Sequence, residues 1–346
     1  MPRSLKPASC RSPEVPELPE VETVARDLRG LVLGAEITGA ACHWERTLRT
    51  HAPETIGPAL AGRRILGVGR RGKQLVLDLS GGAVLTVHLK MTGQLFVVAN
   101  DAPMDRHVRL VIAFADGRDL RFRDIRKFGK IGLYQVDPAT GEAVHEAGGA
   151  AVFAGTGPEP LDDAFTLRAF RHRIRARHGR LKPLLLDQSF VAGIGNIYAD
   201  EALWASRLHP LRSASTLRPA DERHLYEAIR RILAEAIVRR GSSIDDYTAP
   251  EGDGSMQELL LAYQRAGQPC VRCGRPIRRI VIGARATHFC SWCQRLPAPD
   301  RKAAAAILRG MTTGDAGSAR ARERADRTRR AAAARRAAAR VAAGGA

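Results

Sequence analysis

The chain has 346 residues, enough for two domains that each bury a core. Its 55 lysines and arginines exceed its 36 aspartates and glutamates, giving a formal charge of +19 that indicates a polyanionic partner, because phosphate contacts release counterions. No stretch approaches the roughly 18 unbroken apolar residues of a membrane span, and residues 1–15 lack the apolar core of a signal peptide. We therefore expect a cytoplasmic protein with no membrane partner.

The N-terminal half changes its hydrophobic period from that of a helix to that of strands. Residues 19–33 carry apolar side chains at the i, i+3, i+4, i+7 spacing of an amphipathic helix, with Pro19 suited to its first turn and Gly34 to its end. From about 63 to 135 the period is two, and Gly81-Gly82 and Asp116-Gly117 mark hairpin turns. This pattern predicts one helix followed by an antiparallel β-rich domain.

The second half begins with a Gly-, Ala- and Pro-rich stretch over 137–160 that is typical of a linker. Helical periodicity follows, most clearly over 221–239. Residues 300–346 contain twelve arginines and lysines against four acidic residues, so they carry +8 of the +19 and the rest of the chain is basic without them. Their Ala/Arg-rich composition predicts disorder, or a helix that forms only on a partner; a solvated appendage and a DNA-binding arm are both compatible with it.

Four of the six cysteines form two Cys-x2-Cys pairs, a spacing that indicates zinc ligands rather than disulfides in a cytosolic chain. Four thiolates fill every position of a tetrahedral site, so we predict one structural zinc ion. The run Ile277–Ile282 between the pairs predicts a β-hairpin, with Arg285 at its tip in a position to meet a phosphate. The predicted ligands are Cys270, Cys273, Cys290 and Cys293.

The eight residues Pro16-Glu17-Leu18-Pro19-Glu20-Val21-Glu22-Thr23 resemble the opening of the formamidopyrimidine-DNA glycosylases, bacterial enzymes of base-excision repair. Further similar motifs follow in order: His88–Gly93, Asp124–Gly129, Gly193–Tyr198 and the cysteine pairs. The resemblance implies an α+β fold, with an N-terminal antiparallel β-sandwich and its N-terminal helix. A helical domain with a helix–two-turn–helix and a zinc-finger β-hairpin would follow.

The implied domains are a catalytic β-sandwich over 16–136, a linker over 137–160 and a helix–two-turn–helix DNA-binding domain over 161–262. The zinc finger would occupy 263–295 and a disordered basic tail 296–346. Residues 1–15 would be an extension that is either not translated or removed.

The resemblance implies a bifunctional glycosylase and abasic-site lyase that removes oxidised purines such as 8-oxoguanine and formamidopyrimidines by a Schiff base, followed by β,δ-elimination. Its substrate would be duplex DNA with oxidised bases or abasic sites, bound by a monomer. Pro16 would be the nucleophile and Glu17 a proton donor. Lys73 would donate a proton in β-elimination, and Arg285 in δ-elimination while it grips a phosphate.

Other residues would hold the DNA. Met91, Arg126 and Phe128 resemble the residues that fill the space left by an everted base, which offsets the lost stacking. The remaining implied DNA contacts are His107, Lys182 and Asn196. The Gly- and Ser-rich stretch 241–256 corresponds to the family's mobile loop over the everted base.

The position of Pro16 conflicts with this chemistry, since the nitrogen of an in-chain proline is a tertiary amide and cannot attack a sugar carbon. Val15 precedes it, and a valine codon such as GTG can start translation, so we predict a start at residue 15 and a free Pro16 after removal of the initiator. Three alternatives stay open: an endonuclease VIII-type glycosylase for oxidised pyrimidines, a non-catalytic lesion-binding protein, and a zinc-ribbon RNA-binding or ribosomal protein.

Overall fold

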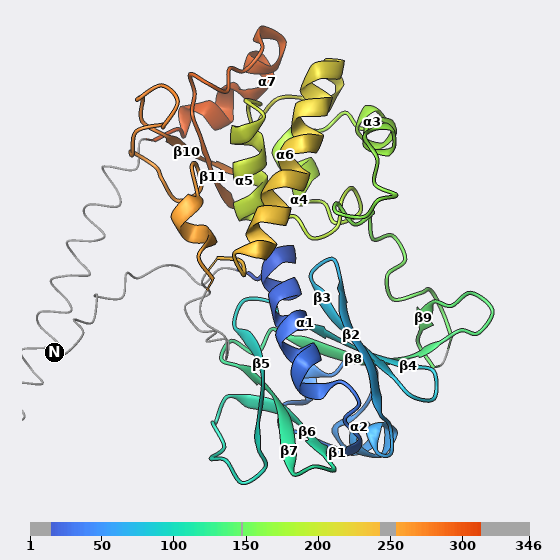
Figure 1. Cartoon of the computed structure of the whole chain (residues 1–346). Helices are drawn as coiled ribbons and strands as arrows, with labels where there is room; N and C mark the ends of the chain where they lie inside the picture. Colours follow the sequence, from blue (N-terminus) through green and yellow to red (C-terminus); the bar gives the residue numbers. More distant parts are fainter. Residues whose placement is uncertain (1–14, 147, 243–253, 313–346) are drawn as a thin grey trace, which may run out of the picture.

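The computed structural model describes residues 15–146, 148–242 and 254–312. The chain forms a β domain and a helical domain, and the long helix α1 (Leu18–Val32) joins them (Figure 1). Its first residues lie beside the helical domain, and the rest of the helix packs on the β domain through Val21, Val24 and Leu28. The predicted helix over 19–33 is therefore confirmed, with Gly34 in the left-handed conformation just after it.

Two antiparallel sheets build the β domain, with strand orders β1-β6-β7-β5 and β2-β3-β4-β8-β9. Leu75, Leu77 and Leu79 point into the core between them, while Asp78 on the opposite face is exposed. Gly81-Gly82 and Asp116-Gly117 turn the β3–β4 and β6–β7 hairpins, as the sequence predicts. Apart from α1, the elements are β1 (Ile37–Cys42), α2 (Pro53–Leu60), β2 (Ile65–Arg71), β3 (Gln74–Leu79), β4 (Ala83–His88), β5 (Gly93–Ala99), β6 (Val108–Phe114), β7 (Arg118–Asp124), β8 (Lys130–Val136) and β9 (Ala143–Val144).

The helical domain surrounds a separate apolar core that includes Phe170, Phe190 and Leu225. The hairpin β10–β11 packs against α5. This arrangement confirms the predicted α+β class, with a β-sandwich followed by helices and a hairpin. The elements are α3 (Leu167–Arg175), α4 (Leu181–Leu186), α5 (Asn196–Ala205), α6 (Pro219–Val238), β10 (Arg278–Ile282), β11 (Arg285–Phe289) and α7 (Ala298–Arg309).

The helix α7 corrects the prediction of a disordered tail from residue 296. Ala304 is buried against the hairpin and the helical domain, and Ile307 and Leu308 pack on the same apolar cluster. After α7, the backbone of Thr312 exchanges hydrogen bonds of 2.8 and 2.9 Å with Arg279 of β10. Composition gave the wrong prediction for this segment. A few apolar residues on one face of an alanine-rich helix are enough to keep it folded when another element covers that face. Residues 313–346 lie outside the described part of the chain.

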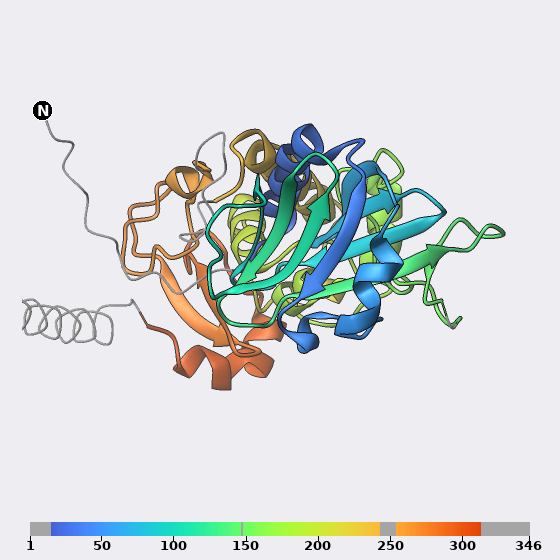
Figure 2. The same cartoon turned by 90° about the horizontal axis from the view of Figure 1, so that it is seen from below.

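Figure 2 shows the hairpin and α7 together at one side of the molecule, opposite β9. None of the helices among the described residues is long and apolar enough to cross a bilayer.

The predicted linker contributes a residue that ties the two domains together. The Glu159 carboxylate accepts hydrogen bonds from the Arg70 and Arg71 guanidiniums at 2.5 and 2.9 Å and from the Gly72 N–H at 2.6 Å. These donors belong to the end of β2 and the β2–β3 turn, so Glu159 fixes the turn that carries Lys73. Burial alone would raise the pKa of Glu159, but the Arg70 charge and these hydrogen bonds outweigh it and hold that pKa below its usual value.

We predict that Glu159→Gln lowers the free energy of unfolding by about 1–3 kcal/mol, because the half-buried group loses its charge and one of the two oxygens that accept these donors. Since the folded-state pKa is depressed, the contribution is present above the unfolded value and disappears as the pH falls through the folded one. Denaturant unfolding between pH 7 and pH 3 measures it. The control Glu36→Gln removes the exposed ion pair with Arg64 and should cost under about 1 kcal/mol. Equal effects at both sites would contradict the anchoring role of Glu159.

Candidate active site

A cavity of about 210 Å³ opens where the two domains meet at the start of α1. Residues distant in sequence line it, so the fold, and not a single motif, assembles the site. From the β domain and the N-terminal segment come Val15, Glu17, Lys73 and Met91. From the helical domain and the hairpin come Asn196 and Arg285. Pro16 is buried between Val15 and Glu17.

Glu17 connects the two domains through its carboxylate. It accepts hydrogen bonds from the backbone N–H groups of Gly195 at 2.6 Å, Ile197 at 2.8 Å and Tyr198 at 3.4 Å. These groups open α5, so Glu17, which precedes α1, caps a helix of the other domain and faces the positive end of its dipole. A Cβ atom on Gly195 would lie 2.3 Å from the Glu17 carboxyl carbon, which explains why a glycine stands in this turn.

Burial raises the pKa of Glu17 to about 7, although the Lys73 charge and the N–H groups of Ile197 and Gly195 lower it. The nearby Glu20 raises it further. Burial also lowers the pKa of Lys73, against the opposing effect of Glu17 and Glu20, and Arg285 lowers it further. The cavity therefore holds a carboxyl group and an amine whose pKa values move toward each other, as expected where protons are exchanged.

Glu20 holds the segment between Pro16 and α1 in place. Its carboxylate accepts the Glu17 N–H at 2.9 Å and the Tyr198 hydroxyl at 2.6 Å. It also accepts the N–H and the hydroxyl of Ser242 at 2.9 and 3.0 Å. Ser242 is the last described residue before 243–253, so most of the predicted mobile loop over 241–256 lies outside the described residues.

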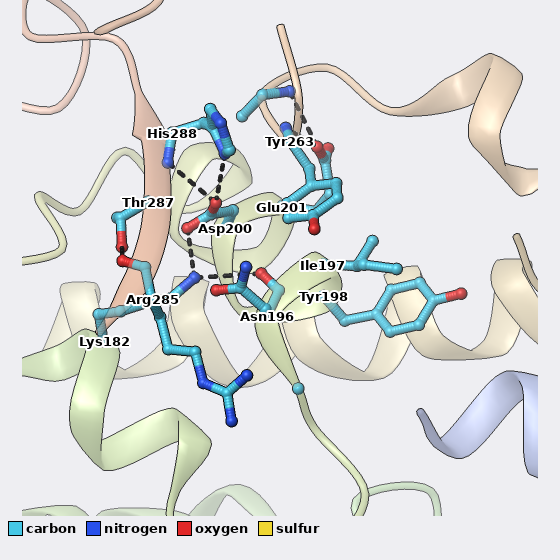
Figure 3. A network of polar contacts seen from close by, with 12 residues as sticks. Lys182, Asn196, Ile197, Tyr198, Asp200, Glu201, Tyr263, Arg285, Thr287 and His288 are labelled. Carbon is cyan, nitrogen blue, oxygen red and sulfur yellow. Dashed lines mark hydrogen bonds and ion pairs between the residues drawn. The ribbon is translucent and has the colours of Figure 1, made fainter. Parts of the chain in front are cut away.

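The two helical-domain residues predicted to contact phosphate differ in exposure. Lys182 is fully buried, and its ammonium pairs with Asp200 at 2.5 Å and donates to the Asn196 carbonyl at 3.1 Å (Figure 3). In this structure the Lys182 ammonium therefore positions α5, and its contact with DNA stays a prediction. Asn196 lines the cavity, and its buried side-chain oxygen has no hydrogen-bond partner among the described residues.

Asp200 also positions the hairpin that carries Arg285. Its second carboxylate oxygen accepts the His288 N–H at 2.9 Å and lies 3.1 Å from His288 Nδ1. Figure 3 shows these contacts above the Arg285 guanidinium, which extends away from them. Arg285 is exposed at the start of β11, so the fixed strand presents its charge at the cavity. The sequence does not single out Asp200 as part of this arrangement.

Asp124 holds in place the segments of the β domain whose side chains are predicted to fill the space left by an everted base. It is fully buried and accepts the Thr92 hydroxyl at 2.5 Å, the Gly129 N–H at 2.7 Å and the Arg126 N–H at 3.2 Å. Its bonds connect the turn that carries Met91 to the loop that carries Arg126 and Phe128. The Arg126 guanidinium lies 5.1 Å from the centre of the Phe128 ring, which is 49% exposed.

His107 lies next to Asp124 in the β domain. Its carbonyl accepts the Asp124 N–H at 2.9 Å, and its Nδ1 lies 3.3 Å from an Arg109 guanidinium nitrogen. Of the predicted DNA-contact residues, Met91 and Asn196 line the cavity, whereas His107, Arg126 and Phe128 do not. These three extend the candidate interface across the β domain.

The four predicted cysteine ligands meet in the zinc finger. Their sulfur atoms all lie within 4.8 Å of one another. A tetrahedral site with Zn–S bonds of about 2.3 Å needs sulfurs about 3.8 Å apart, so the cluster fits a zinc ion with small adjustments. The protein thus holds one structural zinc, and because sulfur fills every position the metal takes no part in catalysis.

We predict that metal removal releases the hairpin and leaves the β domain folded, because thiolate coordination supplies about 10–16 kcal/mol to a module with little core. Hydrogen exchange on metal-free and zinc-loaded protein tests this. Amides of β10 and β11 should lose protection, and amides of β3 and β4, which serve as the internal control, should keep it. Hairpin amides that stay protected without metal would rule out the structural role.

Known proteins match the chain along most of its length. Family models match over 15–131 (formamidopyrimidine-DNA glycosylase N-terminal domain), 156–248 (its H2TH domain) and 267–296 (the zinc finger found in FPG and IleRS). The formamidopyrimidine-DNA glycosylase of Herpetosiphon aurantiacus is 46% identical over 282 residues, 81% of this chain and 100% of that protein. The one of Roseiflexus is 44% identical over 81% of this chain and 100% of its own.

Solved structures also match the fold of the chain. A mutant of Lactococcus lactis FPG, in complex with DNA that contains Fapy-dG, has a TM-score of 0.74 at 37% identity and covers 81% of this chain and 100% of its own. Lactococcus lactis Fpg with abasic-site DNA has a TM-score of 0.73 at 36% identity, over 81% of this chain and 99% of its own.

A β-sandwich and a zinc-bearing helical domain that meet at a buried carboxyl–amine cavity define a DNA glycosylase of base-excision repair. The chain belongs to the formamidopyrimidine-DNA glycosylase family, whose members are glycosylases and abasic-site lyases.

Proposed function

We propose that the protein removes oxidised purines, 8-oxoguanine and formamidopyrimidines, from duplex DNA and then cleaves the strand at the abasic site by β,δ-elimination. The observation that carries this proposal is the convergence of Glu17, Lys73, Asn196 and Arg285 on one cavity beside Pro16. The DNA in the related Lactococcus lactis complexes, which contains Fapy-dG or an abasic site, supports the same substrate class. Chromosomal DNA as substrate would place the protein in the bacterial cytoplasm, acting as a monomer.

In the proposed reaction the Pro16 amine bonds to C1′, and the bond between C1′ and the base breaks. The departing base keeps the electron pair and takes up a proton. Glu17 protonates the sugar ring oxygen as the ring opens and an iminium forms on Pro16, which acidifies the C2′ proton. Loss of that proton expels the 3′ phosphate and a second elimination expels the 5′ phosphate, with Lys73 and Arg285 as the proton donors.

The proposal requires Pro16 to be the amino-terminal residue of the active form, since only a free secondary amine can form the iminium. Val15 as the translation start, followed by its removal, satisfies that requirement. The match to the family model begins at residue 15, which supports this start.

We predict that protein beginning at Pro16 forms a covalent adduct with abasic-site DNA when borohydride reduces the iminium. The matched control retains residues 1–15 ahead of Pro16 and should show background trapping with unchanged DNA affinity. Intact mass of each sample establishes its first residue, and mutation of codon 1 in the native gene should leave expression intact. Full trapping by the extended protein would disprove the Pro16 mechanism.

Excision of thymine glycol in preference to 8-oxoguanine would instead indicate that the substrates are oxidised pyrimidines.

We predict that base excision slows as the pH rises through about 7, because Glu17 must be protonated to act and its pKa is about 7. Single-turnover rates should fall about tenfold per pH unit above that value where the Pro16 amine is already neutral. Since the folded-state pKa exceeds the unfolded one, the stability that Glu17 contributes is present at low pH and is lost as the pH rises to about 7. Glu17→Gln should remove both dependences. A rate profile in Glu17→Gln that still falls near pH 7 would assign the titration to another group.

A further inference from the structure

A second hollow lies outside the catalytic site, between the zinc finger and α7. Its volume is about 500 Å³, within the range of small-molecule and side-chain pockets. The zinc-finger model that matches this chain ends at residue 296, whereas Arg301 and Leu308 of α7 form one wall of the hollow. The helix α7, which follows the segments that the family models match, therefore forms part of this pocket.

Two arginines, Arg295 and Arg301, line the hollow, and Arg275 packs on Trp292, which also lines it. The guanidiniums of Arg275 and Arg295 lie 3.8 and 4.4 Å from the centre of the Trp292 indole ring, and Trp292 is 47% exposed. Arg301 donates through Nε to the Leu296 carbonyl at 2.9 Å, which leaves its terminal nitrogens available. Among the described residues, none of these three arginines forms a salt bridge with a carboxylate.

The wall combines apolar surface with a recessed donor. Trp292, Leu296 and Leu308 supply the apolar part. His209 also lines the hollow, is only 3% exposed, and accepts the Leu211 N–H through Nδ1 at 3.1 Å. Burial lowers the pKa of His209 to about 3, so the ring is neutral and its proton sits on Nε2. That N–H has no acceptor among the described residues.

The hollow is separated from the catalytic cavity by the length of the hairpin. Arg285 begins β11 and Phe289 ends it, and Cys290 to Trp292 follow beyond the strand. Five strand residues span about 16 Å, so the two sites lie at opposite ends of the hairpin. A partner in the hollow would not need to displace DNA at Arg285.

We propose that this hollow binds an acidic peptide segment of a partner protein, with an apolar side chain against Trp292 and Leu308. Its carboxylates would pair with Arg295 and Arg301 in the hollow and with Arg275 beside Trp292, since none of the three is paired with a carboxylate in the described part of the chain. A nucleic-acid strand could stack a base on the exposed Trp292, but its phosphates would leave the apolar side chain of Leu308 without a partner. The basic stretch 313–346 of the same chain is excluded as occupant by charge repulsion with these arginines.

Fluorescence anisotropy with a labelled probe peptide tests the proposal; the probe carries several aspartates around one leucine and has an amidated C-terminus. Full-length zinc-loaded protein should bind it saturably. Arg295→Glu, at an exposed side chain in contact with Trp292, should weaken binding at least about tenfold through charge reversal. Leu308→Ser should weaken it through the apolar wall, and borohydride trapping on abasic DNA should stay unchanged in both variants, showing that they fold.

The matched control is Arg223→Glu, which reverses an exposed charge on α6 and should leave peptide affinity unchanged. A control peptide with asparagine in place of aspartate should bind at least about tenfold more weakly. Three outcomes would overturn the proposal: no saturable binding by the wild-type chain, equal weakening by Arg223→Glu and Arg295→Glu, or an equal loss of abasic-duplex affinity in Arg295→Glu. The last outcome would assign the surface to DNA.

Discussion

The capping of α5 by the Glu17 carboxylate is the interaction on which the rest of the structure depends. One side chain satisfies backbone donors of the helical domain, fixes the position of the segment before α1, and stands in the catalytic cavity. Burial opposes the charge that the capping hydrogen bonds favour, and the balance raises the pKa of Glu17 to about 7. Domain assembly and the proposed proton transfer thus depend on the same group, so a change that weakens the domain contact also alters the pKa of Glu17.

Other buried or half-buried carboxylates also connect separate segments of this basic protein. Asp124 connects the Met91 turn to the Arg126 loop, Asp200 connects Lys182 of α4 to His288 of the hairpin, and Glu159 connects the predicted linker to the β2–β3 turn. In each case a rigid anchor inside the protein supports exposed or half-buried basic and apolar side chains at the surface. Such anchors keep the cationic groups close together despite their mutual repulsion.

The helix α7 extends this organisation beyond the segments that match the family. It closes an apolar cluster on the hairpin and creates a cationic hollow on the side away from Arg285. The zinc finger therefore presents two ends with different chemistry: an exposed arginine beside the catalytic cavity and an indole flanked by arginines beside α7. Because zinc and Asp200 hold the hairpin, both ends are presented by one rigid element.

The sequence by itself determined the local features of this protein: the period-two strands around Leu75, the helix after Pro19, the cysteine spacing and the motif that begins at Pro16. These are encoded over a few neighbouring residues, so propensity and spacing reveal them. Only the tertiary structure decided that Lys182 is buried against Asp200, that Asp124 and Glu159 are anchors, and that α7 is ordered. Each of these depends on burial by elements distant in sequence, which sets whether a charge is paired or exposed and whether a weak helix has a surface to pack on.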